Sequence, residues 1–340
     1  MMQVNEKGAT MKTWDKIAWG LVAGIGASQL IRARKAHISY AAQFVEDTLS
    51  VASEILPGQR SNYDRLYNLA YNQNVVPTEL SWGKRALGFD YLDDMTDTFV
   101  VEAAEATSSQ VVFYLTGGGY WLQPTIFHFA MVRKLADKVK GQVVVPLFPK
   151  GPTYHIADAH QMILARYMYL LNEKKIDAKN ITTMGDSTGG ALAVAFMQQL
   201  RDAGLPLPGA AVLISPLLDG SLQNVAVGFD QVDYEPFLQP KLLELETVTF
   251  AKPFSAINPL ISPWYGSFEG LPPMQIVIGT RDMTLTYIAV LKDRAERENL
   301  AISFDVYPHM AHIFPIYPIP EADQALDSMV AFIEQVSERD

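Results

Sequence analysis

Short apolar runs alternate with longer amphipathic segments over most of this chain. Runs rich in β-branched and aromatic residues predict buried strands, and apolar residues that recur every three or four positions predict helices. The strands expected from these runs are 98–102, 110–115, 142–146, 180–184, 209–216, 273–279 and 302–306. The helices expected between and after them are 127–138, 156–171, 191–197, 284–298 and 321–336. Because strands and helices alternate, we expect an α/β fold with a mostly parallel central sheet flanked by helices.

Two parts of the chain depart from this alternation. Residues 38–55 and 63–71 carry spaced apolar positions with few breakers, which predicts a helical N-terminal region over residues 1–82. A larger domain over residues 83–340 follows, and within it residues 219–257 form a long irregular insertion rich in aromatic side chains. Long insertions often cover functional sites, so we expect residues 219–257 to act as a lid.

Composition and charge exclude several classes of function. The net charge of −10, with basic residues scattered along the chain, is unfavourable for nucleic-acid binding, so we expect no nucleic-acid partner. The absence of cysteine excludes disulfides, thiolate chemistry and cysteine metal sites. His155, Asp158 and His160 lie close together, but their spacing matches no standard ligand motif, so we expect no metal site.

Residues 17–31 form a long apolar stretch near the start of the chain. The stretch is shorter than the roughly twenty residues of a membrane-spanning helix, and it is interrupted by Gly20, Gly24 and Gly26. A helix packed on the protein's own surface is one interpretation, and a signal peptide or weak membrane association through residues 17–31 are the others. The Arg-rich segment that follows is a poor sequence to stand after a cleavage site, so we expect a cytoplasmic protein.

Ser187 lies at the junction between a predicted strand and a predicted helix, flanked by Gly185 and Gly189. This G-x-S-x-G arrangement is typical of a nucleophile elbow, in which a strained serine is presented at the end of a sheet. A glycine-rich turn with a capping serine is the alternative interpretation of the same five residues. In an elbow, the helix N-terminus behind the serine favours the negative charge that develops when the serine attacks an ester carbonyl.

Three consecutive glycines, residues 117–119, follow the strand predicted over 110–115. Glycine allows the backbone to turn its N–H groups toward a ligand, so this segment predicts an oxyanion-binding loop rather than a flexible turn. Tyr120 and Trp121 come directly after the glycines. Together with the aromatic side chains of residues 219–257, they predict an apolar substrate pocket.

Two further candidates, Asp282 and His312, also follow predicted strands. Reactive residues of open parallel sheets gather at the carboxyl ends of the strands, so we expect these two side chains to lie near Ser187. The order Ser, Asp, His is that of the α/β-hydrolase triad, in which the histidine takes the serine proton and the aspartate holds the imidazole in the useful tautomer. His309 is a competing histidine three positions earlier.

The sequence resembles the hormone-sensitive-lipase-like branch of the α/β-hydrolases, a family of bacterial carboxylesterases. The likeness runs from about Phe99 to the C-terminus and rests on motifs that recur in the family's order. Residues 185–190 are similar to the family's GDSAGG, 116–119 to its HGGG, 215–219 to its SPxxD, 259–282 to its run into the catalytic acid, and 309–314 to its GMxHxF.

The resemblance implies a role for each candidate. Ser187 is the nucleophile, His312 is first base and then acid, and Asp282 orients His312. His309 is discounted, because the family's motif has glycine at that position. The N-terminal region and the insertion are implied to form a largely helical cap over the catalytic domain. The implied oxyanion hole consists of the backbone N–H groups of Gly118, Gly119 and Thr188.

The chain departs from the family pattern at three positions. Thr116 stands where the family has a histidine whose side chain supports the oxyanion loop through hydrogen bonds. Thr188 replaces an alanine and adds bulk beside the nucleophile, and Thr286 lies near the position where a second acidic residue often follows the catalytic acid. The three triad candidates are all retained.

These patterns predict a serine carboxylesterase that cleaves short-chain acyl esters through an acyl-enzyme on Ser187, without a metal or organic cofactor. An amidase or deacetylase with the same triad is the close alternative. A non-catalytic ligand-binding protein on the same fold is the other, although the resemblance implies loss of the histidine in such proteins. The expected partner is a small-molecule ester, and assembly into a homo-oligomer is left open.

Overall fold

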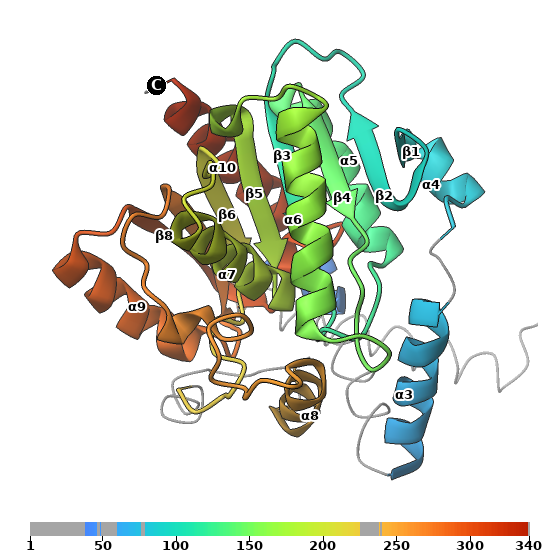
Figure 1. The fold of residues 1–340 in the computed structure, drawn as a ribbon, viewed down its shortest axis with the longest axis vertical. Helices are drawn as coiled ribbons and strands as arrows, with labels where there is room; N and C mark the ends of the chain where they lie inside the picture. The colour runs from blue at the N-terminus through green and yellow to red at the C-terminus, as the bar shows by residue number, and fades with distance from the viewer. Residues whose placement is uncertain are drawn as a thin grey trace, which may run out of the picture.

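The computed structural model describes residues 38–45, 48, 60–75, 79–224, 238 and 240–338. A single sheet occupies the centre of this part of the chain, with its strands in the order β1-β2-β4-β3-β5-β6-β7-β8 (Figure 1). The apolar stretch 17–31 lies outside the described residues. The strands are β1 (Phe89–Leu92), β2 (Met95–Glu102), β3 (Val111–Leu115), β4 (Gln142–Pro146), β5 (Ile181–Asp186), β6 (Ala210–Ile214), β7 (Met274–Arg281) and β8 (Ile302–Ala311).

The sheet is parallel over most of its width. Each neighbouring pair from β4 through β3, β5, β6 and β7 to β8 is parallel, whereas β2 pairs antiparallel with both β1 and β4. The turn between β1 and β2 contains Asp93 and Asp94, whose φ angles of +48° and +64° suit a two-residue hairpin turn. The predicted α/β fold with a mostly parallel sheet is confirmed, and the strand expected at 98–102 is the second half of an antiparallel strand.

Helices cover both faces of the sheet. One face carries α6 (Ile156–Asn172), α7 (Thr188–Asp202) and α9 (Leu285–Glu298), and the other carries α5 (Ile126–Val139) and α10 (Pro320–Ser337) (Figure 1). In β3, Phe113 packs on the first face, while its neighbours Val112 and Tyr114 pack on the second. All residues of β3 are buried, as expected for a parallel strand covered on both faces.

Two further helices, α3 (Arg60–Val75) and α8 (Pro240–Phe250), lie beyond one end of the sheet (Figure 1). Asn74 of α3 donates hydrogen bonds to the carbonyl oxygens of Trp121, at 2.9 Å, and Gly151, at 2.7 Å. Phe250 of α8 stacks on Tyr120 with a centroid separation of 5.0 Å. Both helices therefore contact loops at the end of the sheet where the candidate residues were expected, and the insertion expected to be irregular contains a regular helix.

The described residues 38–45 lie elsewhere, against the start of α10. The backbone N–H and the hydroxyl of Ser39 both donate to the carboxylate of Glu321, at 2.6 and 2.8 Å. Ala42 is buried in the core on the α5 and α10 face. Of the described parts of the N-terminal region, residues 38–45 therefore pack on the main domain, whereas α3 lies beside the loop that contains Trp121. Within the described ranges, no helix is long and apolar enough to cross a bilayer.

The short elements are the helix α4 (Trp82–Ala86) before β1 and the 3₁₀ turns η1 (Ala178–Asn180), η3 (Pro263–Tyr265) and η4 (Phe314–Ile316).

Candidate active site

Ser187 occupies the sharp turn between β5 and α7. Its φ of +50° and ψ of −123° are strained for a residue with a side chain. A Cβ on Gly185 would lie 2.4 Å from the carbonyl oxygen of Gly189, and a Cβ on Gly189 would lie 2.0 Å from that of Leu115. The backbones of strand and helix can approach this closely only because both positions are glycine. The structure therefore places Ser187 in the elbow that the G-x-S-x-G pattern predicts.

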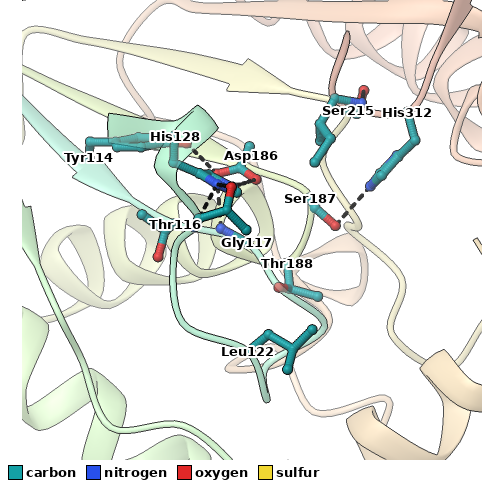
Figure 2. Close-up of polar contacts among 12 residues, drawn as sticks. Tyr114, Thr116, Gly117, Leu122, His128, Asp186, Ser187, Thr188, Ser215 and His312 are labelled. Atoms are coloured by element: carbon teal, nitrogen blue, oxygen red, sulfur yellow. Dashed lines mark hydrogen bonds and ion pairs between the residues drawn. The ribbon is translucent and has the colours of Figure 1, made fainter. Parts of the chain in front are cut away.

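His312 lies between Ser187 and Asp282, just after β8. Its Nε2 is 2.9 Å from Ser187 Oγ (Figure 2), and its Nδ1 is 2.9 Å from Asp282 Oδ2. Because a carboxylate can only accept, Nδ1 carries the proton and Nε2 is left to accept from the Ser187 hydroxyl. The structure brings the three predicted residues into one hydrogen-bonded chain. Among the described residues, the imidazole of the competing His309 makes no hydrogen bond to Ser187 or Asp282, and its backbone N–H donates to Thr280 Oγ1 at 2.7 Å.

Asp282 is completely buried directly after β7. Its Oδ1 accepts hydrogen bonds from the N–H and the hydroxyl of Thr284, at 2.8 and 2.7 Å. Burial alone would raise the pKa of Asp282, but the attraction of His312 and the hydrogen bonds to the carboxyl, one of them from Ser215, lower it below its ordinary value. Asp282 is therefore held as a carboxylate, which is the form that can accept the proton on His312 Nδ1.

The glycine loop, residues 116–122, follows β3 and passes beside the nucleophile (Figure 2). Gly118 and Gly119 have φ angles of +108° and +64°, which favour glycine. A Cβ on Gly118 would also lie 2.3 Å from the carbonyl oxygen of Leu122. Thr188 is tied to this loop, because its hydroxyl accepts the N–H of Tyr120 at 3.3 Å. An alanine in place of Thr188 could not make this hydrogen bond.

Asp186, which the sequence patterns did not single out, anchors the start of the glycine loop (Figure 2). Its carboxylate accepts from the Tyr114 hydroxyl at 2.6 Å and from the Gly117 N–H at 2.9 Å, and it lies 3.4 Å from His128 Nε2. The Nδ1 of His128 accepts the N–H of Thr125 at 3.1 Å, so the ring proton is on Nε2 and faces Asp186. Burial alone would raise the pKa of this carboxyl, but these three partners, His128 foremost, lower it below its ordinary value.

Lys150 supports the same loop, and the sequence patterns did not single it out either. It lies in the segment after β4, is 1% exposed, and donates from its ammonium to the carbonyl oxygens of Gly117 and of Leu122, the latter at 2.7 Å. Burial lowers the pKa of Lys150 to about 7, and the negative charge of Asp186 partly opposes this shift. A single lysine in a Pro-rich segment carries no sequence signal for such a role, because the contacts depend on a loop about thirty residues away.

Thr116 occupies the position where the resemblance implies a supporting histidine. Its side chain is buried, and its carbonyl and hydroxyl oxygens each lie 3.4 Å from Lys150 Nζ. In this chain the polar support of the loop comes from Asp186 and Lys150, and the imidazole at the site belongs to His128 of α5.

Tyr120 and Trp121, the predicted substrate-binding residues, belong to the glycine loop, and the side chains of both are buried. The hydroxyl of Tyr120 donates to the carbonyl oxygen of Ile261 at 3.1 Å, and its ring stacks on Phe250. Trp121 packs edge-on against Tyr67 of α3, with ring centroids 5.8 Å apart. These contacts join α3 and α8 to the loop beside Ser187.

Glu246 reaches from α8 to the glycine loop. A Cβ on Gly119 would lie 2.2 Å from Glu246 Oε2, so the carboxyl group packs directly on this glycine. The side chain is buried, and burial raises the pKa of Glu246 well above its ordinary value. Burial therefore favours the uncharged form of this carboxyl.

The cluster His155, Asp158 and His160 has structural contacts at the start of α6. The carboxylate of Asp158 accepts the N–H of His155 at 2.9 Å in a capping arrangement, and Nε2 of His160 donates to the carbonyl oxygen of Leu260 at 2.9 Å. Across the described residues, no group of three or more histidine, aspartate and glutamate side chains is placed to hold a metal ion.

Comparison with known proteins places the chain in a family. A family model described as alpha/beta hydrolase fold matches residues 112–316. An esterase of Acinetobacter venetianus is 28% identical over 232 residues, which are 67% of this chain and 76% of that protein. An acetyl-hydrolase of Streptomyces hygroscopicus is 30% identical over 226 residues, which are 66% of this chain and 75% of that protein.

Solved structures share the fold. A candidate esterase of Staphylococcus aureus has a TM-score of 0.75 at 29% identity, covering 82% of this chain and 94% of that one. An esterase of the bacterial hormone-sensitive lipase family has a TM-score of 0.66 at 24% identity, covering 83% of this chain and all of that one, a likeness that concerns the fold. The predicted resemblance to the α/β-hydrolases is confirmed. With more than half of its length matched, and with Ser187, Asp282 and His312 inside the matched span, the chain belongs to the alpha/beta hydrolase fold family.

Proposed function

We propose that the protein hydrolyses carboxylic esters with Ser187 as the nucleophile. The observation that carries this proposal is the chain of hydrogen bonds from Ser187 through His312 to Asp282, with both contacts at 2.9 Å. A serine, a base and an orienting carboxylate in this geometry, beside a loop of glycines, are the parts that acyl transfer requires. Relatives named esterase and acetyl-hydrolase support the same chemistry.

In the first half of the reaction, Ser187 Oγ attacks the carbonyl carbon of the ester while His312 Nε2 takes the hydroxyl proton. The bond from the carbonyl carbon to the alcohol oxygen then breaks, and the alcohol leaves with the proton from Nε2, so that an acyl-enzyme forms. In the second half, water attacks the acyl-enzyme and His312 takes a proton from it. Ser187 regains that proton as the carboxylic acid leaves. Asp282 keeps Nδ1–H in place and stabilises the imidazolium.

The backbone N–H groups of Gly118, Gly119 and Thr188 are assigned the role of donating hydrogen bonds to the negatively charged oxygen of the tetrahedral intermediate. Thr188 is the first residue of α7, and the unpaired N–H groups and dipole at a helix N-terminus favour negative charge. The positive φ angles of Gly118 and Gly119 turn the loop backbone out of the extended conformation of β3. Each such donor is worth about a hundredfold to a thousandfold in kcat.

Esters with a short acyl chain are the proposed substrate class. Tyr120 and Trp121 would border the acyl group, and their buried contacts with α3 and α8 support a confined apolar space beside the glycine loop. The relative named acetyl-hydrolase agrees with a small acyl group.

The test compares the full-length protein with Ser187→Ala on p-nitrophenyl esters of increasing acyl length. Ser267→Ala, at an exposed position outside the site, is the matched control. We expect Ser187→Ala to lose activity by about a millionfold, as removal of a triad serine does, and the control to keep it. A fluorophosphonate probe should label Ser187 in the wild type, as peptide mass spectrometry would detect.

Three other results would redirect the proposal. Anilides hydrolysed faster than esters would indicate an amidase with the same triad. A wild type that labels at Ser187 but hydrolyses neither class would have a reactive serine without turnover. A wild type that neither labels nor hydrolyses would favour a ligand-binding protein and would contradict the proposal.

A further inference from the structure

Lys150 and Asp186 hold the two peptide units that flank Gly117, one each. The carboxylate of Asp186 accepts the N–H of Gly117 at 2.9 Å, and the ammonium of Lys150 donates to the carbonyl oxygen of the same residue. Further hydrogen bonds of the ammonium go to Leu122 O at 2.7 Å and to the two oxygens of Thr116 at 3.4 Å. Among the described residues, the hydrogen-bond partners of the ammonium therefore all belong to the glycine loop.

The hydrogen bond from Lys150 to the Gly117 carbonyl oxygen fixes the direction of the Gly118 N–H group. The bond from Gly117 to Gly118 is trans, and in a planar trans peptide the N–H points opposite to the preceding C=O. Because the Gly117 carbonyl points at Lys150, the Gly118 N–H points away from Lys150. Gly118 has a positive φ and no side chain, so without this hydrogen bond its peptide would have several accessible orientations.

An apolar side chain would fill the space of Lys150 at lower energetic penalty. Burying an ammonium away from water is costly, and replacing buried charges with apolar groups of similar volume is often neutral or stabilising. The charge at this position therefore needs a reason beyond packing. A cation bound to a carbonyl oxygen draws electron density from its amide, which makes the N–H of that amide a stronger donor.

We propose that Lys150 is a positioning residue for ester hydrolysis, which orients the Gly117–Gly118 peptide so that the Gly118 N–H meets the oxyanion, and strengthens that donor. This inference rests on the proposed function. It assigns to Lys150, together with Asp186, the support that the resemblance ascribes to a histidine at the position of Thr116. Lys150 itself touches neither the substrate nor the triad; it acts through Gly118.

One charged side chain among the described residues, that of Asp186, acts on the ammonium, and it has polar partners of its own. Asp186, at the end of β5, is the carboxylate whose charge acts on Lys150, and it is itself bonded to Tyr114 of β3 and near His128 of α5. On the remaining side the ring centroid of Phe148 lies 4.9 Å from Nζ. Since burial lowers the pKa of Lys150 to about 7, the support that it gives should weaken in mildly alkaline solution.

The test compares Lys150→Met, which keeps the length and loses the donor, with Lys174→Met, a surface lysine paired with Asp93, as the control. For Lys150→Met we expect kcat to fall by about a hundredfold or more, as after loss of an oxyanion donor, with KM little changed. Affinity for a trifluoromethyl ketone, which adds to the serine and leaves an oxyanion, should fall by a similar factor. Affinity for the matching methyl ketone should not.

A structural defect would give a different pattern. It would lower the binding of both ketones, the melting temperature and the fraction of active sites labelled by a fluorophosphonate. A Lys150→Met protein with wild-type kcat, or with a change in KM alone, would overturn the inference while the ester hydrolase stands. If wild type and Ser187→Ala are equally inactive, the proposed function fails first.

If Lys150→Met does not fold, Lys150→Gln takes its place, because its amide can still donate to the Gly117 carbonyl without charge. We expect an intermediate kcat and loss of the alkaline fall in kcat that the wild type should show above about pH 7. The same alkaline fall in kcat in Lys150→Gln as in the wild type would contradict the inference.

Discussion

The hydroxyl oxygen of Ser215 lies 3.0 Å from the backbone nitrogen of Ile313, the residue after His312. The oxygen accepts the Ile313 N–H, and the same hydroxyl contributes to the lowered pKa of Asp282. A single buried side chain at the end of β6 therefore ties the loop that carries His312 to the carboxylate that orients it. Ser215 belongs to the segment similar to the family's SPxxD, but its role depends on contacts that only the fold brings together.

Ser215→Ala should loosen the histidine without removing any triad member. The Ile313 N–H would be left buried without its acceptor, and the contribution of Ser215 to the lowered pKa of Asp282 would be lost. We expect kcat for a short-chain ester to fall by about tenfold, since a buried hydrogen bond is worth about 1–3 kcal/mol when one partner is removed. Steady-state kinetics beside Ser267→Ala provide the measurement. An unchanged kcat would mean that His312 is positioned without Ser215.

Asp282→Asn should have a larger effect. An amide at this position can present its N–H₂ to the imidazole, which would place the proton on Nε2 and prevent His312 from accepting the Ser187 proton. We expect kcat to fall by about 10⁴-fold, as after the same change in a serine protease triad. The melting temperature serves as the control for folding. Loss of less than about tenfold would show that the triad does not depend on this carboxylate.

Asp186→Asn tests the anchor of the glycine loop through stability. The folded pKa of Asp186 is depressed, so its charge stabilises the fold above the unfolded pKa of about 3.9, and this contribution is lost as the pH falls through the folded value. The variant should be less stable than the wild type by about 1–3 kcal/mol at neutral pH. Urea denaturation should show the difference shrinking in acid. A difference that is constant with pH would contradict the ionised state of Asp186.

Glu246→Gln should have the opposite pH dependence. The folded pKa of Glu246 is raised, so the stability of the wild type falls as the pH rises above the unfolded pKa of about 4.3. Glutamine has nearly the same shape and no charge to bury. We therefore expect the variant to gain stability relative to the wild type as the pH rises from about 5 to 8, as urea denaturation would measure. Parallel pH profiles for the two proteins would contradict a raised pKa of Glu246.

Sequence patterns predicted the elements whose structure is determined by residues close together in the chain. The G-x-S-x-G turn around Ser187 and the periodicity of residues 156–171 correspond to the elbow and to α6, because strand, turn and helix are each specified within a few residues. The first strand, β1, was missed, since only Phe89 and Leu92 of its residues are buried and its pairing depends on the hairpin turn. Helix α8 was missed because its contacts with the glycine loop come from distant residues.

The residues of the candidate site also fall into a group that the sequence predicts and a group that it does not. Ser187, Asp282 and His312 each follow a strand, so their positions along the chain predict that they meet at one edge of the sheet. Lys150 and Asp186 have no such signal, although Asp186 is next to the nucleophile in the sequence. Their importance comes from the hydrogen bonds that they make to the N–H and the carbonyl oxygen of Gly117, contacts that only the folded chain brings about.

The backbone conformation of Ser187 restricts which residues could ever replace it. Threonine has the same hydroxyl, but a side chain branched at Cβ is a steric outlier at a φ of +50°. Cysteine has a different reacting atom, yet it is unbranched and fits the same turn. In this chain a change of nucleophile from oxygen to sulfur is therefore open to a single substitution, whereas the chemically milder change from serine to threonine is closed by geometry.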